Sequence, residues 1–144
     1  MLSYDDIKKI LPHRFPFLLV DRVDSIQKGY QISGVKNISF SELSHRDKEE
    51  SFYYPHALII ESLGQLAAIL YLQSTHPVSN VEFIFGGAKN ISIEGFIKNM
   101  DCQLSLYATI EDLNESYCIA SAFATHDGKT ILSIEQMYTK IIYL

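Results

Sequence analysis

The chain has 144 residues, of which 47% are hydrophobic and 20% are charged, and its formal net charge is -5. This composition is typical of a folded protein rather than a disordered one, and the length fits one domain with a substantial core. The negative charge argues against nucleic acid as a partner, because binding to phosphates requires clustered Lys and Arg. We therefore expect a single domain over residues 1–144.

The N-terminal stretch MLSYDDIKKI has no basic segment followed by an apolar one. We therefore expect no signal peptide and a cytoplasmic location. Within the same stretch, Ser3-Tyr4-Asp5-Asp6 resembles a capping box. It predicts a short helix that ends at about Ile10.

The segment after that helix contains Pro12 and Pro16, which predict irregular structure. β-forming residues then dominate 17–26 and 30–40, with Lys28-Gly29 suited to the turn between them. This region therefore predicts two consecutive strands.

A charged loop over residues 41–52 precedes the most apolar part of the chain. Pro55 suits the first turn of a helix, which we expect to continue to about Ser74. The apolar run from Ala57 to Leu72 is shorter than the roughly 20 residues that a membrane span needs. We expect this helix to lie in the core of the domain and not in a membrane.

The remainder of the chain predicts strands. Residues 81–94 are rich in β-formers, and Gly86-Gly87 suggests a bulge or a close backbone approach. Apolar and polar residues alternate over 103–110, as in a half-buried strand. Residues 116–125 and 129–142 predict a hairpin, because Asp127-Gly128 between them favours a type I′ turn.

The order of these elements predicts the fold. A helix that is apolar all round must be enclosed, and a curled antiparallel sheet from the neighbouring strands can enclose it. We therefore expect an α+β protein with the hot-dog fold, in which an antiparallel β-sheet wraps around one long central helix. Its open sheet edges favour pairing with a second copy of the chain.

Glu61 stands in the middle of the apolar helix, and Gln65 follows one turn later. A carboxyl group desolvated among aliphatic side chains favours its neutral form, so it could hold and donate a proton. An unpaired buried acid costs several kcal/mol and is rarely kept without a function. The alternative is a structural Glu that hydrogen-bonds to a polar neighbour.

Two stretches suggest a family. Residues 11–23, LPHRFPFLLVDRV, resemble the N-terminal signature of FabZ-type (3R)-hydroxyacyl-[acyl-carrier-protein] dehydratases, and residues 57–68, ALIIESLGQLAA, resemble their catalytic helix. Residues 86–106 and 126–137 are weaker, collinear matches. The resemblance implies a homodimer or a trimer of such dimers, an acyl substrate carried by an acyl carrier protein or coenzyme A, and neither a metal nor another cofactor.

The same resemblance implies a reaction. In that family a His of one subunit and a Glu on the partner's central helix eliminate water from a β-hydroxyacyl thioester. A base must remove the α-proton and an acid must protonate the hydroxyl, while a backbone N–H at a helix N-terminus can bind the thioester oxygen. Glu61 matches the family's Glu. The candidates for substrate binding are Phe52, Tyr54, His56, Ala57, Gln65 and Gly87.

The loop before the helix departs from the family. The family's catalytic His lies in the motif G-H-F-P-G-x-P-x-M-P-G, where this chain has RDKEESFYYPH. Ungapped counting from Glu61 places Asp47 at the His position and His56 at the last glycine, and His45 is the nearest His. Three hypotheses stay open: His45 is the base, Asp47 stands there with altered chemistry, or the site binds without dehydrating.

His56 has two interpretations of its own. It could offer an imidazole as a base or donor at the helix N-terminus, whose dipole favours the neutral ring, or it could serve packing. Phe52 and Tyr54 could line an acyl channel or pack in the core. We expect His13 and Arg14 to be structural.

Two other functions remain possible from the sequence. Hot-dog proteins often hydrolyse acyl thioesters, so a thioesterase is the second enzymatic hypothesis. The missing His and glycines favour a third, an acyl-binding or scaffolding subunit. Cys102 and Cys118 have no His at a catalytic spacing, and the sequence contains no metal-ligand cluster, phosphate loop or dinucleotide fingerprint.

Overall fold

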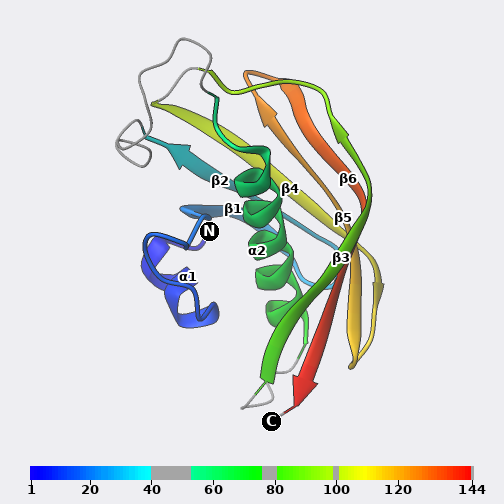
Figure 1. Ribbon diagram of the computed structural model, residues 1–144. Coiled ribbons are helices and arrows are strands. Elements are labelled where there is room, and N and C mark those ends of the chain that lie inside the picture. Colours follow the sequence, from blue (N-terminus) through cyan, green and yellow to red (C-terminus); the bar gives the residue numbers. More distant parts are fainter. Residues whose placement is uncertain (40–52, 76–80, 99–100, 144) are drawn as a thin grey trace.

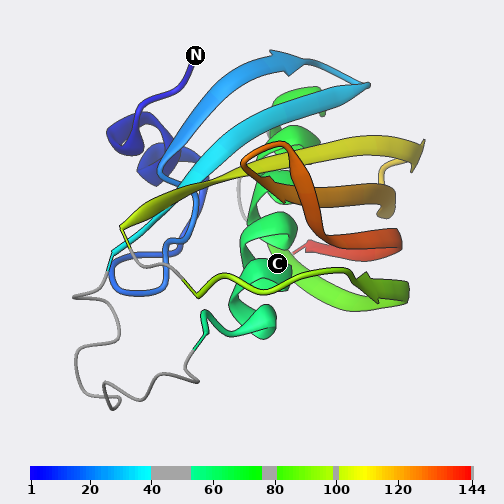
Figure 2. The same ribbon diagram turned by 90° about the horizontal axis from the view of Figure 1, so that it is seen from above.

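A computed structural model of the chain describes residues 1–39, 53–75, 81–98 and 101–143. Its strands form a six-stranded antiparallel sheet in the order β1-β2-β4-β5-β6-β3. The sheet curves around the long helix α2, and the short helix α1 lies on the other side of α2 (Figures 1 and 2). The predicted hot-dog arrangement is thus confirmed. The elements are α1 (Tyr4–Ile10), β1 (Arg22–Gln27), β2 (Gln31–Ile38), α2 (His56–Ser74), β3 (Val81–Ile93), β4 (Cys102–Leu113), β5 (Tyr117–His126) and β6 (Lys129–Tyr143).

The capping box at the start of α1 is confirmed. The Ser3 hydroxyl accepts a hydrogen bond from the Asp6 N–H at 3.2 Å, and the Asp6 carboxylate accepts one from the Ser3 N–H at 3.0 Å. These bonds satisfy two backbone donors that helix formation would otherwise leave free. Ile7, fully buried, joins the helix to the core.

The prediction of a strand from residue 17 is wrong at its beginning, because β1 starts only at Arg22. The backbone of the preceding residues is hydrogen-bonded elsewhere: the Leu19 N–H donates to Gln65 Oε1 at 2.8 Å, and the Phe17 carbonyl accepts from Gln65 Nε2 at 2.9 Å. A side chain of α2 thus takes the backbone groups that a strand partner would need.

The predicted turn and bulge are both present. Asp127 and Gly128, between β5 and β6, have φ values of 49° and 76°, and positive φ at both central residues is required for a type I′ turn. In β3 the pairing with β6 shifts register between Phe85 and Gly87, and Gly87 has a φ of 143° that a residue with a Cβ rarely adopts.

The core lies between α2 and the concave face of the sheet. Ile59, Leu63, Leu66 and Leu70 of α2 are fully buried, as is Leu106 of β4. Complete burial of one such side chain contributes about 1.5–3 kcal/mol. The helix is not enclosed on every side, however, because a stripe on its opposite face stays partly exposed; it consists of Ala57, Ile60, Glu61 and Gly64.

The length and composition of α2 would also suit a membrane-spanning helix. The core helix of a soluble protein has the same properties, and 56% of the most apolar window of α2 is buried inside this fold. The covering sheet therefore accounts for the apolar sequence of α2 without a membrane.

Candidate active site

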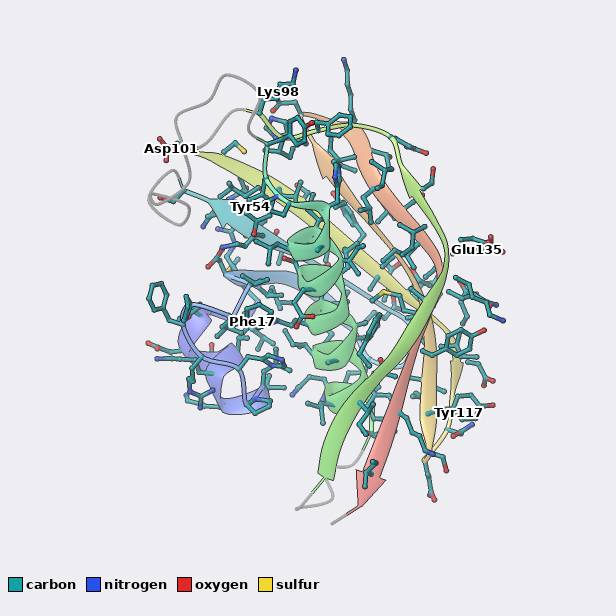
Figure 3. All side chains as sticks on the ribbon, viewed as in Figure 1. Phe17, Tyr54, Lys98, Asp101, Tyr117 and Glu135 are labelled. Carbon is teal, nitrogen blue, oxygen red and sulfur yellow. The ribbon has the colours of Figure 1, made fainter. Side chains whose placement is uncertain are left out.

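The partly exposed stripe of α2 borders a small cavity of about 100 Å³. The cavity lies where α2 meets the segment after α1 and the strands β3 and β6. In Figure 3 the labelled Phe17 lies on that segment, beside α2. The cavity is lined by His13, Ile60, Glu61, Gly64, Gln65, Ala68, Phe85 and Thr139.

Glu61 is the acid of this cavity. Its side chain is 34% exposed, so the expectation of a carboxyl enclosed by aliphatic side chains is wrong for the single chain. The reason is its position on the stripe of α2 that the sheet leaves uncovered. Glu61 Oε1 accepts a hydrogen bond from Gln65 Nε2 at 3.0 Å, while Oε2 has no hydrogen-bond partner in the part of the chain that the structure describes.

Gln65 connects the acid to the backbone of the N-terminal segment. Its side chain is only 2% exposed. The amide oxygen accepts from the Leu19 N–H, and the amide nitrogen donates to both the Phe17 carbonyl and Glu61. Both N–H donors of Gln65, a residue predicted to bind substrate, are therefore used in contacts within the protein.

His13 is a member of the cavity that the sequence did not indicate. Its Nε2 lies 3.8 Å from Glu61 Oε1, and its side chain is 32% exposed. Its Nδ1 is buried and has no hydrogen-bond partner within the described ranges. The sequence predicted only a structural role for this residue, because His13 and Glu61 are far apart in the chain and meet only through the tertiary fold.

His56 is directed to other partners. Its Nε2 lies 2.8 Å from the carbonyl oxygen of Gly95, which can only accept, so Nε2 carries the proton. The imidazole also makes an edge-to-face contact with Phe96 at a centroid distance of 5.0 Å. His56 does not line the Glu61 cavity, and these contacts favour the packing interpretation.

The other predicted site residues are spread around the helix start. Tyr54 is 1% exposed and belongs to the hydrophobic core, which favours core packing over an acyl-channel role. Ala57 is exposed in the first turn of α2, one turn before Glu61. Gly87 lies at the β3 bulge and outside the cavity lining. His45, Asp47 and Phe52 lie outside the described residues.

Both cysteines lie on strands; Cys118 is buried and Cys102 is half-buried. Burial, with a smaller contribution from Asp112, raises the pKa of the Cys118 thiol to about 12. Burial also raises the pKa of Cys102, with smaller contributions from Asp127 and Asp101. A thiol that stays protonated is a poor nucleophile. Across the described ranges, no group of three or more His, Cys, Asp or Glu could hold a metal ion.

The sequence is similar to a known family of domains. The family model described as the FabA-like domain matches residues 11–135. The 3-hydroxyacyl-[acyl-carrier-protein] dehydratase FabZ of Halalkalibacterium halodurans is 32% identical over 139 residues, which cover 96% of this chain and 98% of that protein. The protein of the same name from Geobacillus thermodenitrificans is 33% identical over 139 residues, covering 96% and 94%.

Solved structures support the fold. A chain of the dehydratase heterocomplex ApeI:P from Xenorhabdus doucetiae superimposes with a TM-score of 0.78 at 13% identity, over 97% of this chain and 91% of that one. A thioesterase from Pseudomonas aeruginosa superimposes with a TM-score of 0.74 at 8% identity, over 100% and 96%. At such low identities these likenesses concern the fold and not the reaction.

Proposed function

The chain belongs to the FabA-like domain family, and from that premise we propose that it is a dehydratase that eliminates water from β-hydroxyacyl thioesters bound to an acyl carrier protein. The relatives to which this chain is similar along nearly their whole length, with about a third of the residues identical, are 3-hydroxyacyl-[acyl-carrier-protein] dehydratases. The observation that supports this proposal most directly is the position of Glu61. It lies on α2, whose sequence resembles the catalytic helix of that family, it lines the cavity, and it accepts a hydrogen bond from Gln65.

The elimination needs a proton donor at the β-hydroxyl and a base at the α-carbon. In our proposal Glu61 gives its proton to the leaving hydroxyl, so that the C–O bond breaks and water departs. The base removes the α-proton, and that electron pair forms the Cα–Cβ double bond of the enoyl thioester. Charge that develops on the thioester oxygen would be stabilised by backbone N–H groups, for which the first turn of α2 at Ala57 and the bulge at Gly87 are the candidates.

We propose His45 as the base, since it is the nearest His to the position at which the family keeps its own. An imidazole titrates near neutral pH, which suits a group that must take up and release a proton in each turnover. Asp47 is the weaker candidate, because a second carboxylate near Glu61 would favour protonation of one of the two.

We further propose that the working unit contains at least two copies of the chain. β3 is an edge strand of the sheet, and several of its large apolar side chains are exposed, namely Ile84, Phe85, Ile91 and Ile93. An exposed apolar edge strand is a template for pairing with another chain. A second copy on this edge would cover the Glu61 cavity from the β3 side. Light scattering on the purified protein should then give a multiple of the 16.4 kDa chain mass.

The dehydratase proposal is tested with a 3-hydroxyacyl acyl-carrier-protein substrate and the purified chain. Formation of the enoyl thioester, followed by its ultraviolet absorbance and by the mass loss of one water, is the expected result. Release of a free thiol without enoyl product would identify a thioesterase instead. Saturable binding of the substrate without either product would identify an acyl-binding subunit and contradict the dehydratase proposal.

A further inference from the structure

We propose that His13 is a positioning residue for the Glu61 carboxyl: its neutral imidazole donates the Nε2–H to Glu61 Oε1. His13 Nε2 lies 3.8 Å from that oxygen, and both side chains line the same cavity. A hydrogen bond of this type needs about 2.7–3.2 Å, so the two groups must approach by less than about 1 Å. The role rests on the proposed function, because it concerns how the acid of that reaction is held.

The surroundings of the ring decide which nitrogen carries the proton. Nδ1 is buried and has no hydrogen-bond partner in the described part of the chain. A proton on Nδ1 would therefore be a buried donor without an acceptor, which costs about 1–3 kcal/mol. On Nε2, by contrast, the proton faces the Glu61 carboxyl, and this favours the Nε2–H tautomer.

The same reasoning distinguishes a positioning residue from a base. A base would need a free lone pair on Nε2, with the proton on Nδ1, and would become an imidazolium that donates from both nitrogens. Both forms place a proton on the buried, unpartnered Nδ1. His13 is thus poorly suited to remove the α-proton and well suited to remain a neutral donor.

As a consequence, the Glu61 carboxyl would be held through one of its two oxygens, Oε1. Gln65 Nε2 already donates to Oε1 at 3.0 Å, and His13 adds a second donor to the same atom. Oε2, which has no partner among the described residues, is then left to exchange the proton with substrate. Donors that fix the non-reacting oxygen reduce the freedom of the carboxyl before the reaction, which is the purpose of preorganisation.

The backbone that carries His13 is itself restrained from both sides. Arg14 Nη1 donates to the carbonyl oxygens of Leu11 and His13 at 2.8 and 2.7 Å. Further along, Gln65 holds the backbone of Phe17 and Leu19. Gln65 therefore restrains both the acid and the segment that presents the imidazole, so that the three side chains form one connected unit.

Two amide variants separate a donor role from a packing role. In His13→Gln the amide nitrogen reaches about as far as Nε2, whereas in His13→Asn it reaches only about as far as Nδ1. We expect the Asn variant to lose about tenfold or more in kcat, the value of one hydrogen bond to a charged group. We expect KM to change by less than about twofold in both variants, and the Gln variant to keep at least about a third of the wild-type kcat.

The opposite results overturn the proposal. If Gln and Asn lower kcat equally while thermal unfolding is unchanged, His13 acts as a base and not as a donor. If both variants unfold earlier and lose activity in parallel, its role is structural. If neither variant changes kcat, the imidazole has no part in the reaction.

A spectroscopic measurement keeps this inference separate from the dehydratase proposal. Should the wild-type protein eliminate no water, the proposed function fails, and ¹⁵N chemical shifts of His13 then decide the contact alone. We expect the Nε2–H tautomer, with shifts that change in Glu61→Ala and not in the control Glu135→Ala on the outer side of the sheet (Figure 3). An Nδ1–H tautomer, or shifts that ignore Glu61→Ala, would refute the contact.

Discussion

His13 and His56 both lie beside α2, yet their imidazoles have different surroundings. His13 lines the cavity, with Nε2 near the Glu61 carboxyl and Nδ1 without a partner in the described ranges. His56 stands at the first residue of the helix, where its Nε2 donates to the Gly95 carbonyl and its ring meets Phe96. One imidazole faces a group that can exchange protons, and the other is bound to a backbone oxygen that cannot.

The difference shows that a His close in sequence to the family's catalytic motif need not face the Glu61 cavity. His56 lies inside the stretch that corresponds to the family's catalytic motif, whereas His13 belongs to a stretch expected to be structural. The surroundings of the two rings point the other way: His56 Nε2 is hydrogen-bonded to the Gly95 carbonyl, whereas His13 Nε2 lies 3.8 Å from the Glu61 carboxyl. The region around His56 should therefore respond to substitution through stability, and the region around Glu61 and His13 through turnover.

The strongest test of this contrast is Glu61→Gln. The amide is nearly isosteric and can still accept the Gln65 hydrogen bond through its oxygen, so the fold should persist. It cannot donate a proton to the leaving hydroxyl. We expect kcat to fall by about 10²–10⁴, the usual contribution of a general acid, with thermal unfolding close to wild type.

The control for that variant is Glu61→Asp, which keeps the acid but withdraws it by one methylene. An intermediate kcat would show that both the proton and its position matter. Full activity in Glu61→Gln would remove Glu61 from the chemistry and, with it, the contrast between the two regions.

Gln65→Leu tests whether the polar contacts of Gln65 beside the cavity also stabilise the fold. The substitution leaves the Leu19 N–H and the Phe17 carbonyl without their partner. Each unsatisfied buried group costs about 1–3 kcal/mol, so we expect the free energy of unfolding to fall by about 2–4 kcal/mol. Urea denaturation at equilibrium measures the change.

A second substitution in the same cavity provides the comparison. Thr139 lines the same cavity, is 7% exposed and is nearly isosteric with Val, so Thr139→Val should change the free energy of unfolding by no more than about 1.5 kcal/mol, the net value of one hydrogen bond. Equal losses in Gln65→Leu and Thr139→Val would mean that the cavity tolerates no change, and not that the Gln65 contacts are special.

Local rules account for the parts of the fold that the sequence predicted. The capping box before α1 and the Asp127-Gly128 turn each depend on a few neighbouring residues. The start of β1 was misplaced because the competing group, the Gln65 side chain, comes from a distant helix. β-propensity alone has no information on such a partner.

The candidate site likewise has features that the sequence predicts and features that it does not. Glu61 and Gln65 were predictable because a polar pair inside an apolar run is visible in the sequence. The exposure of Glu61 was not predictable, because a helix that is apolar on all sides does not indicate which face the sheet will cover. The approach of His13 depends on how the N-terminal segment folds back over α2, and no periodic pattern records that.

His56→Ala tests the packing side of the contrast. It removes the hydrogen bond to Gly95 and the ring contact with Phe96, each worth about 0.5–1.5 kcal/mol. We expect the free energy of unfolding to fall by about 1–2 kcal/mol and kcat to stay within about threefold of wild type. A fall in kcat as large as that of Glu61→Gln would instead make His56 the missing base.

Cys118, on the sheet, should have the smallest of these effects, a change in how the free energy of unfolding depends on pH. Its pKa is raised by burial from 9.0 to about 12, so the folded protein keeps this proton while the unfolded chain releases it near pH 9. Between these values the unfolded state binds fewer protons, and the free energy of unfolding therefore falls as the pH rises. The contribution of Cys118 is fully present below about pH 9.

The measurement compares urea denaturation of wild type and Cys118→Ala at several pH values from 8 upward. Other groups titrate in this range in both proteins, so the difference between their slopes isolates the thiol. We expect the wild type to lose more stability with increasing pH than the variant. Parallel slopes would mean that the fold does not hold the Cys118 thiol protonated.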